Sequence, residues 1–369
     1  MIVEHAPGDG HFSHVFFTNG GADAIENAVR MARLHTGRRK VISRYRSYHG
    51  NTTTAINLTG DPRRWPNDYG AEGVVHVFGP YLYRSEFSAT TEAEEVERSL
   101  AHLRRTVEME GPATIAAIVL ESIPGTAGIM VPPAGYLRGV REICDEYGIL
   151  WIADEVMSGF GRAGRWFACE LADEVPDGGT AQDGAWRPAG DGVRALPDLI
   201  TFAKGVNSGY VPLGGVLIST PVVETFATRV FPGGLTYSGH PLATAAAVAN
   251  MTVMVEEGVV EHADRLGREV FGPGLRELAA RHEIVGEVRG VGGFWALELV
   301  NDRSTKALLS DAPGNPMGAL GAACRRLGLL PFVNGSRTHV VPALTITEEE
   351  ARYGLALLDA ALGEVEAGL

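Results

Sequence analysis

The feature that most constrains the fold is a series of short apolar runs that alternate with helix-like segments. "TIAAIVLES" (114–122), "ILWIADEV" (149–156) and "DLITFAKG" (198–205) are almost free of polar residues in their interiors. Between the first two lies "PPAGYLRGVREICDEYG" (132–148), with proline near its start and glycine just past its end, as is typical of a helix. Strands without polar alternation are covered on both faces, so this order predicts an α/β fold with a mainly parallel sheet covered by helices.

Further elements extend this pattern toward both ends of the chain. Additional strands are predicted at 14–19, 40–44 and 214–219, and helices at 22–34, 240–256 and 258–280. Beyond about residue 265 the pattern changes to a smaller α+β unit, with "GEVRGVGGFWALELV" (286–300), a helix near 316–327, a short strand near 338–341 and a last helix from 347. We therefore expect a large domain over 1–265 and a small C-terminal domain over 266–369. The Gly-, Asp- and Pro-rich stretch 171–197 predicts a mobile surface loop.

Composition and charge exclude several classes of function. The 369 residues carry a formal net charge of −13, which disfavours nucleic acid and anionic membrane surfaces as partners. No apolar run is long enough to span a bilayer, and the N-terminus "MIVEHAPGDG" has no export-signal pattern. Three widely spaced cysteines, Cys144, Cys169 and Cys324, indicate reduced thiols and a cytoplasmic location. The histidines of "HFSH" (11–14) have no further ligands nearby, so no metal site is predicted.

Lys204 is the most unusual residue of the predicted sheet. It lies in the apolar, glycine-rich stretch 197–216, and no acidic residue stands between Asp198 and Glu224 to pair with it. Burying an unpaired ammonium is costly, and a desolvated lysine tends to lose its proton instead. A neutral lysine amine is a nucleophile that can form a Schiff base with a carbonyl group.

Other chemically distinctive residues also follow predicted strands. The backbone amides near Gly20, Gly21 and Ala22 open a helix and are free to hold an anion. A Gly-Gly pair before a helix is, however, most often an ordinary turn. Asp154 and Glu155 end the strand "ILWIA", where adjacent acids suit a buried cation, although carboxylates after strands commonly cap turns.

"YHG" (48–50) adds the Tyr48 ring and the His49 imidazole after a third strand. Ligands of such sheets bind beyond the carboxyl ends of the strands, so these groups are expected to converge. An anion-binding turn, an acid, an amine nucleophile and a flat ring together match the parts of pyridoxal 5'-phosphate (PLP).

"GFGRAG" (159–164) offers a competing interpretation, because it matches the dinucleotide-binding pattern G-x-G-x-x-G after a strand. Asp154 and Glu155 lie just before these glycines, where they would repel a pyrophosphate. The strand-terminal acid that contacts the ribose in such folds is also missing about 20 residues further on. The sequence therefore disfavours a dinucleotide site.

Several motifs in order resemble those of the class III (ω-amino) aminotransferases of PLP fold type I. They are "FFTNGGADAIENAVRMAR", "YHGNT", "IADEVMSGFGRAGRWFA", "TFAKG" and "GLTYSGHPLA", and the similarity runs from about residue 12 to the C-terminus. The resemblance implies a PLP-dependent transaminase that moves an amino group from an amine or ω-amino acid to a 2-oxo acid.

The resemblance also implies roles for individual residues. Lys204 would carry the cofactor as an aldimine and shuttle the proton, and Asp154 would pair with the pyridine nitrogen. The remaining implied cofactor contacts are Gly20, Gly21 and Ala22 at the phosphate, Tyr48 and Val156 on the two ring faces, His49 and Glu121 near the ring, and Thr236 at the phosphate of the neighbouring subunit of a homodimer.

Two positions depart from relatives that use 2-oxoglutarate. Those relatives have a glutamate where this chain has Thr126, and an arginine where it has about His339, and the two residues form a switch. Because both are missing, we expect a pyruvate-like acceptor, as in taurine– or β-alanine–pyruvate transaminases. Arg337 is a second candidate for reading a substrate acid group, with a surface role as the alternative.

Family members also carry a segment before the equivalent of "HFSHVFF", so the resemblance implies that this N-terminal segment is missing here. This leaves open an inactive, truncated relative that serves as a binding subunit. A PLP-dependent aminomutase or decarboxylase of the same fold would use the same lysine and stays a further alternative.

Overall fold

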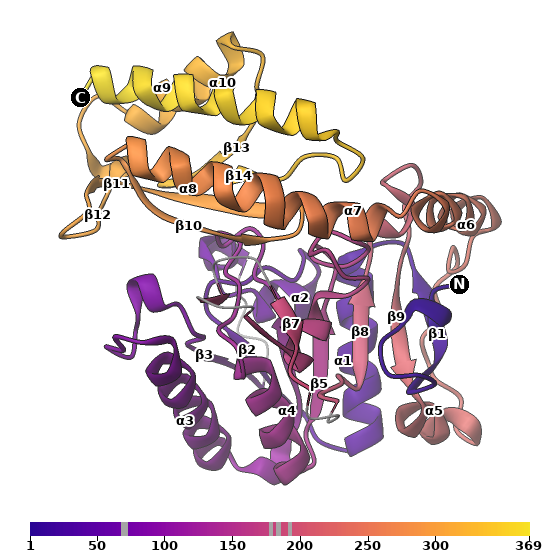
Figure 1. The fold of residues 1–369 in the computed structure, drawn as a ribbon. Coiled ribbons are helices and arrows are strands. Elements are labelled where there is room, and N and C mark those ends of the chain that lie inside the picture. Colours follow the sequence, from indigo (N-terminus) through magenta and orange to yellow (C-terminus); the bar gives the residue numbers. More distant parts are fainter. Residues whose placement is uncertain (68–72, 177–179, 182–185, 191–193) are drawn as a thin grey trace.

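A computed structural model describes residues 1–67, 73–176, 180–181, 186–190 and 194–369 (Figure 1). Its main feature is a seven-stranded sheet in the order β1-β9-β8-β5-β4-β2-β3. The strands are β1 (Phe12–Thr18), β2 (Lys40–Arg44), β3 (Val74–Val77), β4 (Ile115–Glu121), β5 (Leu150–Asp154), β8 (Leu199–Phe202) and β9 (Gly214–Ser219). The five strands from β8 to β3 are parallel, whereas β9 pairs antiparallel with both β8 and β1. The prediction of a mainly parallel sheet is confirmed.

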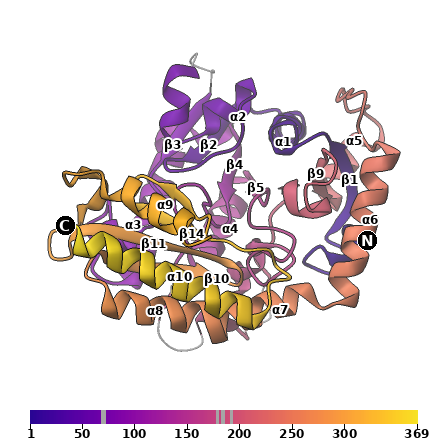
Figure 2. The ribbon, with the colours of Figure 1, turned by 90° about the horizontal axis from the view of Figure 1, so that it is seen from above.

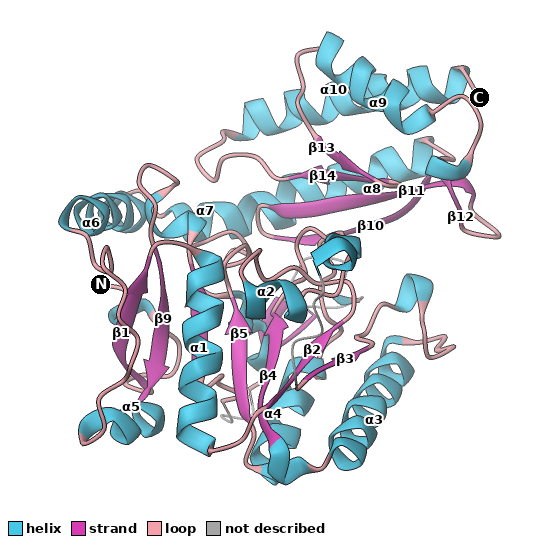
Figure 3. Cartoon of the chain, turned by 180° about the vertical axis from the view of Figure 1, so that it is seen from behind, coloured by secondary structure: helices cyan, strands magenta, loops and turns pink. Residues whose placement is uncertain are grey.

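Helices cover both faces of this sheet, as the apolar strands require. On one face lie α3 (Glu92–Glu110) and α4 (Tyr136–Tyr147), which pack side chains such as Val107 and Ile143 against Ile118 and Trp151. On the other face lie α1 (Gly21–Thr36), α2 (Thr53–Leu58) and α5 (Thr220–Ala227) (Figure 3). From Ala117 to Leu120 the residues of β4 alternate between these two cores, and every residue of the strand is buried.

The C-terminal third forms a second sheet with its own apolar core above the first (Figure 1). Its antiparallel strands are β10 (Val285–Val291), β11 (Phe294–Asp302), β12 (Ala307–Leu308), β13 (Phe332–Asn334) and β14 (Arg337–Val340). Its helices are α8 (Gly272–Arg281), α9 (Pro316–Arg326) and α10 (Glu348–Ala367). Leu266 is the first residue of this core, which supports the division at 265, although the boundary itself stays a proposal.

The helix predicted over 258–280 is divided in the structure. A π-helical turn over Gly267–Phe271 separates α7 (Val259–Leu266) from α8. A Cβ at Gly267 would lie 2.6 Å from the carbonyl oxygen of Gly292, so the backbone of this turn packs directly on the β10–β11 turn. The preceding helix α6 (Pro241–Glu256) runs along the outer flank of the molecule beside β1 (Figure 2).

The stretch 171–197 is more ordered in its described part than the sequence predicts. β6 (Glu174–Pro176) pairs with β7 (Trp186–Pro188), and Ala181, Trp186 and Ala195 are buried. These apolar side chains, scattered among Gly and Asp in the sequence, anchor the segment, so the expectation of a surface loop is wrong for them. Residues 177–179, 182–185 and 191–193 of the predicted mobile loop lie outside the described residues.

Over the described ranges, no helix is both long and apolar enough to cross a membrane. Within the same ranges, no cluster of three or more His, Cys, Asp or Glu side chains could hold a metal ion. Cys144, Cys169 and Cys324 are free and buried.

Candidate active site

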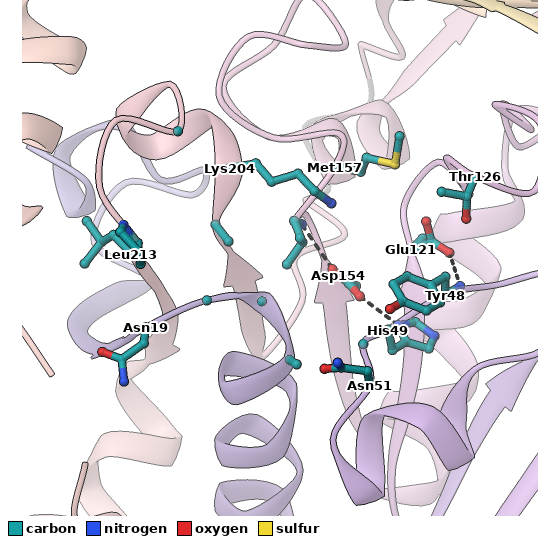
Figure 4. Close-up of a pocket in the computed structure, with 18 of the residues that line it drawn as sticks. Asn19, Tyr48, His49, Asn51, Glu121, Thr126, Asp154, Met157, Lys204 and Leu213 are labelled. Atoms are coloured by element: carbon teal, nitrogen blue, oxygen red, sulfur yellow. Dashed lines mark hydrogen bonds and ion pairs between the residues drawn. The ribbon is translucent and has the colours of Figure 1, made fainter. Parts of the chain in front are cut away.

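A cavity of about 640 Å³ opens at the carboxyl ends of β4, β5 and β8, facing the N-terminus of α1 (Figure 4). All of the predicted site residues except Thr236 line it: Gly20, Gly21, Ala22, Tyr48, His49, Glu121, Asp154, Val156 and Lys204. They come from segments up to about half the chain apart. The topology therefore brings the predicted groups together at the sheet edge where ligands of such folds bind.

Asp154 ends β5 and is held by two hydrogen bonds. His49 Nδ1 lies 2.7 Å from Asp154 Oδ2, and the backbone amide of Val156 donates to Oδ1 (3.0 Å). His49 Nε2 in turn lies 3.2 Å from Ser43 Oγ. Burial disfavours the imidazolium, but the hydrogen bond and charge of Asp154 outweigh it and raise the pKa of His49 above its ordinary value. The pair fixes a carboxylate at the floor of the cavity.

The neighbouring acid, Glu155, does not contribute to this cavity. Its carboxylate accepts hydrogen bonds from the hydroxyl of Ser158 (2.7 Å) and from the amides of Ala168 (3.0 Å) and Cys169 (2.7 Å), as well as from Ser122. These neutral donors satisfy a buried carboxylate whose pKa is raised by burial. The expectation that both adjacent acids would face one buried cation is therefore wrong, because successive residues at the end of the strand point to different sides.

Lys204 follows β8 and reaches into the cavity from the side opposite Tyr48 (Figure 4). Its backbone is in the left-handed region (φ 41°), which is uncommon for a residue with a side chain and typical of constrained functional positions. The Lys204 side chain is exposed in the isolated chain. The prediction that it is buried among apolar residues is therefore wrong for the single chain. The apolar neighbours belong to the strand, whereas Lys204 itself lies beyond its end, between the first cavity and a second one of about 570 Å³.

The N-terminus of α1 forms the anion-binding part of the cavity. No side chain caps this helix, so its first amides are not satisfied by a cap. A Cβ at Gly21 would lie 2.8 Å from Cγ1 of Val156, closer than side chains approach each other, whereas a Cβ at Gly20 would meet nothing within 4 Å. Glycine at position 21 therefore lets Val156 reach over the helix terminus, and the dipole and free amides favour an anionic group there.

Glu121 and Tyr48 form the opposite wall. Glu121 is 5% exposed, and its two carboxylate oxygens accept from the amides of Tyr48 and Gly125 (2.9 Å each). Burial raises the pKa of this carboxyl. The Arg63 guanidinium lies 3.6 Å from the centroid of the Tyr48 ring and donates to Thr126 Oγ1 (2.9 Å).

Arg63 lines the cavity but was missed by the sequence reasoning. Among the residues that line this cavity it is the one arginine. The segment that carries it, "DPRRW", had no predicted element, and only an arginine pair before an aromatic residue marks it.

Thr236 lies outside the cavity, in the exposed segment between α5 and α6. The alternative that it caps the following helix is wrong, because the His240 side chain accepts from the amide of Leu242 at that N-terminus. Because Thr236 is exposed, it is accessible to a neighbouring subunit, and the predicted contact with that subunit stays a prediction.

The two switch positions are separated in the structure. Thr126 lines the main cavity, whereas His339 is buried beside an apolar groove of the C-terminal unit. Burial and the nearby Arg337 lower the pKa of His339 to about 4, so it is neutral near pH 7. His339 does not border the main cavity and is not positioned to replace the arginine of the switch.

Comparison with known proteins gives one consistent family. The profile of the class III aminotransferases matches residues 1–182 and 171–362. A probable aminotransferase of Mycobacterium tuberculosis is 35% identical over 342 residues, covering 89% of this chain and 67% of the relative. The putrescine–pyruvate aminotransferase of Pseudomonas aeruginosa is 33% identical over 353 residues, covering 90% of this chain and 70% of the relative. The chain thus spans about two thirds of the length of these relatives.

Solved structures agree with this comparison. The taurine:2-oxoglutarate aminotransferase of Bifidobacterium kashiwanohense, in complex with PLP and glutamate, is 40% identical and superposes with a TM-score of 0.90. The match covers 100% of this chain and 78% of that one. An (S)-enantioselective ω-transaminase from Thermomicrobium roseum is 36% identical with a TM-score of 0.84, over 99% of this chain and 77% of that one.

The residues of the cavity fit PLP. The α1 terminus with its side-chain-free Gly21 suits a phosphate, and the fixed Asp154 carboxylate suits a protonated pyridine nitrogen. Lys204 supplies the primary amine on the same cavity.

Proposed function

The chain belongs to the class III aminotransferases, which use PLP, and from this premise we propose that its transaminase site is the cavity around Lys204 and Asp154. The observation that carries the proposal is the convergence of an amine, a fixed carboxylate and an uncapped helix terminus on one cavity. When bound, PLP supplies an electron sink for the negative charge that develops at the amine-bearing carbon.

The chain's own residues would divide the remaining work. Lys204 Nζ would hold the cofactor and take the proton from the amine-bearing carbon of the substrate. Asp154, held by His49 and the Val156 amide, would keep a proton on the ring nitrogen. Gly20, Gly21 and Ala22 would hold the phosphate through their amides, and Tyr48, Val156 and Glu121 would shape the ring pocket.

For the amino donor, we propose an ω-amino acid whose distal acid group is bound by Arg63. A guanidinium recognises a carboxylate or sulfonate in a planar, charge-assisted geometry. Arg63 borders the same cavity as Lys204. For the acceptor, the missing glutamate–arginine switch supports pyruvate.

Product analysis with pyruvate tests this function. β-Alanine and propylamine share a carbon skeleton, but only β-alanine carries the acid group. Alanine should form faster from β-alanine than from propylamine, and Lys204→Ala should abolish it with both donors. Failure of the PLP-loaded wild type to transfer an amino group from any amine would support a binding subunit instead. Another product, such as a decarboxylated amine, would support the alternative enzymes.

We also propose a homodimer in which Thr236 reaches the neighbouring site. Several large apolar side chains on and near α6 are exposed: Tyr237 (68%), Leu242 (62%), Val248 (52%), Val253 (44%) and Val255 (51%). Exposed apolar residues gathered on one element support an interface between copies. The buried free cysteines are consistent with a reducing compartment, and the cytoplasm stays a prediction.

Subunit mixing tests the shared site. Lys204→Ala chains and chains with an impaired Thr236 should form hybrid dimers that contain one intact site and recover part of the activity. No recovery despite proven exchange, or full activity in a stable monomer, would contradict the shared site.

A further inference from the structure

A network of buried charges joins the C-terminal unit to residues 1–265, which we call the large unit. Arg289 on β10 is 1% exposed, and its guanidinium forms ion pairs with Glu287 on the same strand and with Glu298 on β11. Burial disfavours the ionised carboxylate of Glu298, but the charge of Arg289 outweighs it and lowers the pKa of Glu298. Figure 1 shows β10 and β11 on the side of the C-terminal unit that faces the large unit.

Two contacts of Arg289 cross to the large unit. Arg289 Nη1 donates to the hydroxyl oxygen of Tyr81 (2.9 Å), and Arg289 Nε donates to the carbonyl oxygen of Gly128 (2.6 Å). A Cβ at Gly128 would lie 2.6 Å from Arg289 Nη2, and Gly128 has φ +127°, which strongly favours glycine. The absence of a side chain at position 128 therefore lets the guanidinium reach the backbone, and a charged donor makes such a hydrogen bond strong.

Gly128 belongs to a turn that ends at the wall of the proposed active site. The amide of Gly128 donates to the carbonyl oxygen of Gly125 (2.9 Å), and the amide of Gly125 donates to Glu121 Oε2 (2.9 Å). The other carboxylate oxygen of Glu121 accepts from the amide of Tyr48 (2.9 Å). A continuous series of hydrogen bonds thus runs from Arg289 to the carboxylate and the aromatic residue that form this wall.

We propose that Arg289 is a positioning residue of the active site. By fixing the carbonyl of Gly128, it holds the turn 124–130 in the conformation that orients Glu121 and, through Glu121, the ring of Tyr48. The inference rests on the proposed function, because this wall matters only where PLP binds in the cavity. The described residues that line the cavity all belong to the large unit. Arg289 therefore lets the C-terminal unit set the shape of a pocket that it does not line.

Two substitutions at Arg289 separate its hydrogen-bond donor from its charge. In Arg289→Lys a methylene group replaces Nε while the ammonium stays beside the two carboxylates, so the charge is kept and the donor to Gly128 is lost. In Arg289→Gln the side-chain amide nitrogen can occupy the position of Nε, so the donor is kept and the charge is lost. Tyr81→Phe is the matched control, because it removes the other contact between Arg289 and the large unit and leaves the contact with Gly128.

Hydrogen–deuterium exchange of the cofactor-free protein measures the turn directly. Loss of a hydrogen bond from a charged donor raises the local opening equilibrium by about tenfold or more. The amides of a peptide that spans 122–130 should therefore exchange about tenfold faster in Arg289→Lys than in wild type. In Arg289→Gln and Tyr81→Phe they should exchange at close to the wild-type rate, even where the thermal midpoint of the variant is lower.

The PLP-loaded protein gives the second readout. Visible circular dichroism of bound PLP reports the surroundings of its ring, so the band should change in Arg289→Lys and be kept in Tyr81→Phe. Displacement of a wall by about 1 Å can cost about a hundredfold in rate. Because the wall acts on the cofactor ring, kcat/KM of Arg289→Lys should fall by about 10- to 100-fold for every donor and acceptor alike. Tyr81→Phe should keep the wild-type value.

The outcomes separate this inference from the proposed function. Absence of transamination by the PLP-loaded wild type with every donor and acceptor would overturn the proposed function, whereas the exchange and dichroism of the variants would still test the positioning role. Unchanged exchange at 122–130 in Arg289→Lys would overturn the inference alone, since the buried side chains of Ile123 and Ile129 would then hold the turn without Arg289.

Two further results would also overturn the positioning role. One is faster exchange of the turn in Arg289→Lys with unchanged dichroism and unchanged kcat/KM. The other is an equal loss of kcat/KM in Arg289→Lys and Tyr81→Phe, which would indicate a general tie between the two units. Should Arg289→Gln fail to fold, the comparison of Arg289→Lys with Tyr81→Phe decides by itself.

Discussion

Gly21→Ala gives the sharpest test of how the cavity is built. The added Cβ would lie 2.8 and 2.9 Å from the two methyl carbons of Val156, about 0.5 Å inside the 3.4 Å at which ordinary contact begins. Overpacking of this kind typically costs ~1–3 kcal/mol, which corresponds to a loss of roughly 5- to 150-fold in an equilibrium constant. Because Val156 and the α1 amides would move apart, we expect the dissociation constant of PLP to rise within this range.

The assay is a titration of cofactor-free protein with PLP, followed by absorbance. Gly354→Ala is the control, since a Cβ there meets nothing within 4 Å and α10 lies outside the cavity, and it should bind PLP normally. Val156→Ala removes the two methyl groups, so the double variant Gly21→Ala/Val156→Ala should bind PLP more tightly than Gly21→Ala alone. Normal binding by Gly21→Ala, or no recovery in the double variant, would refute the reasoning.

Two further perturbations test the electrostatics. Asp154→Asn should retain PLP but reduce turnover at least about a hundredfold, since loss of a buried ion pair costs ~3–5 kcal/mol; steady-state kinetics that show less than a tenfold loss would contradict this role. Burial raises the pKa of Glu170 to about 7. Between pH ~4.3 and ~7 the Glu170 carboxyl is therefore more protonated in the folded chain than in the unfolded chain. The free energy of unfolding falls as the pH rises through this range, by at most about 3 kcal/mol. In Glu170→Gln the side-chain oxygen can still accept from the Phe167 amide. The thermal midpoint of this variant should therefore change less between pH 5 and pH 8 than that of wild type. An equal change in both proteins would exclude Glu170 as the cause of the pH dependence.

The layered fold follows from local patterns that the sequence shows directly. β2 and β9 begin and end at the predicted residues, because apolar β-branched runs bounded by polar or glycine residues define strands sharply. The antiparallel pairing of β9 with β8 and β1 is set by tertiary packing, which no residue pattern in these strands reveals. The sequence likewise does not show that "GFGRAG" (159–164) forms turns and no helix.

The candidate site was predictable where a residue follows a recognisable strand. Asp154, Tyr48 and Lys204 belong to this class, and the structure brings them to one cavity. Arg63 was not predictable, since it stands on a short 3-10 helix (Pro62–Asn67) that no sequence pattern marked and that does not follow a predicted strand. The exposure of Lys204 was also missed, because apolar neighbours in the sequence describe the strand and not the space beyond its end.

The most direct test of the account is the identity of the lysine that carries PLP. The sequence contains only three lysines, Lys40, Lys204 and Lys306. Lys40 pairs with Glu110 at the far end of β2, and the Nζ of Lys306 donates to the carbonyl of Tyr83. Borohydride reduction of the PLP-loaded protein, followed by peptide mass spectrometry, should place the phosphopyridoxyl group on Lys204 alone. Its appearance on Lys40 or Lys306, or bound PLP with no modified lysine, would contradict the account.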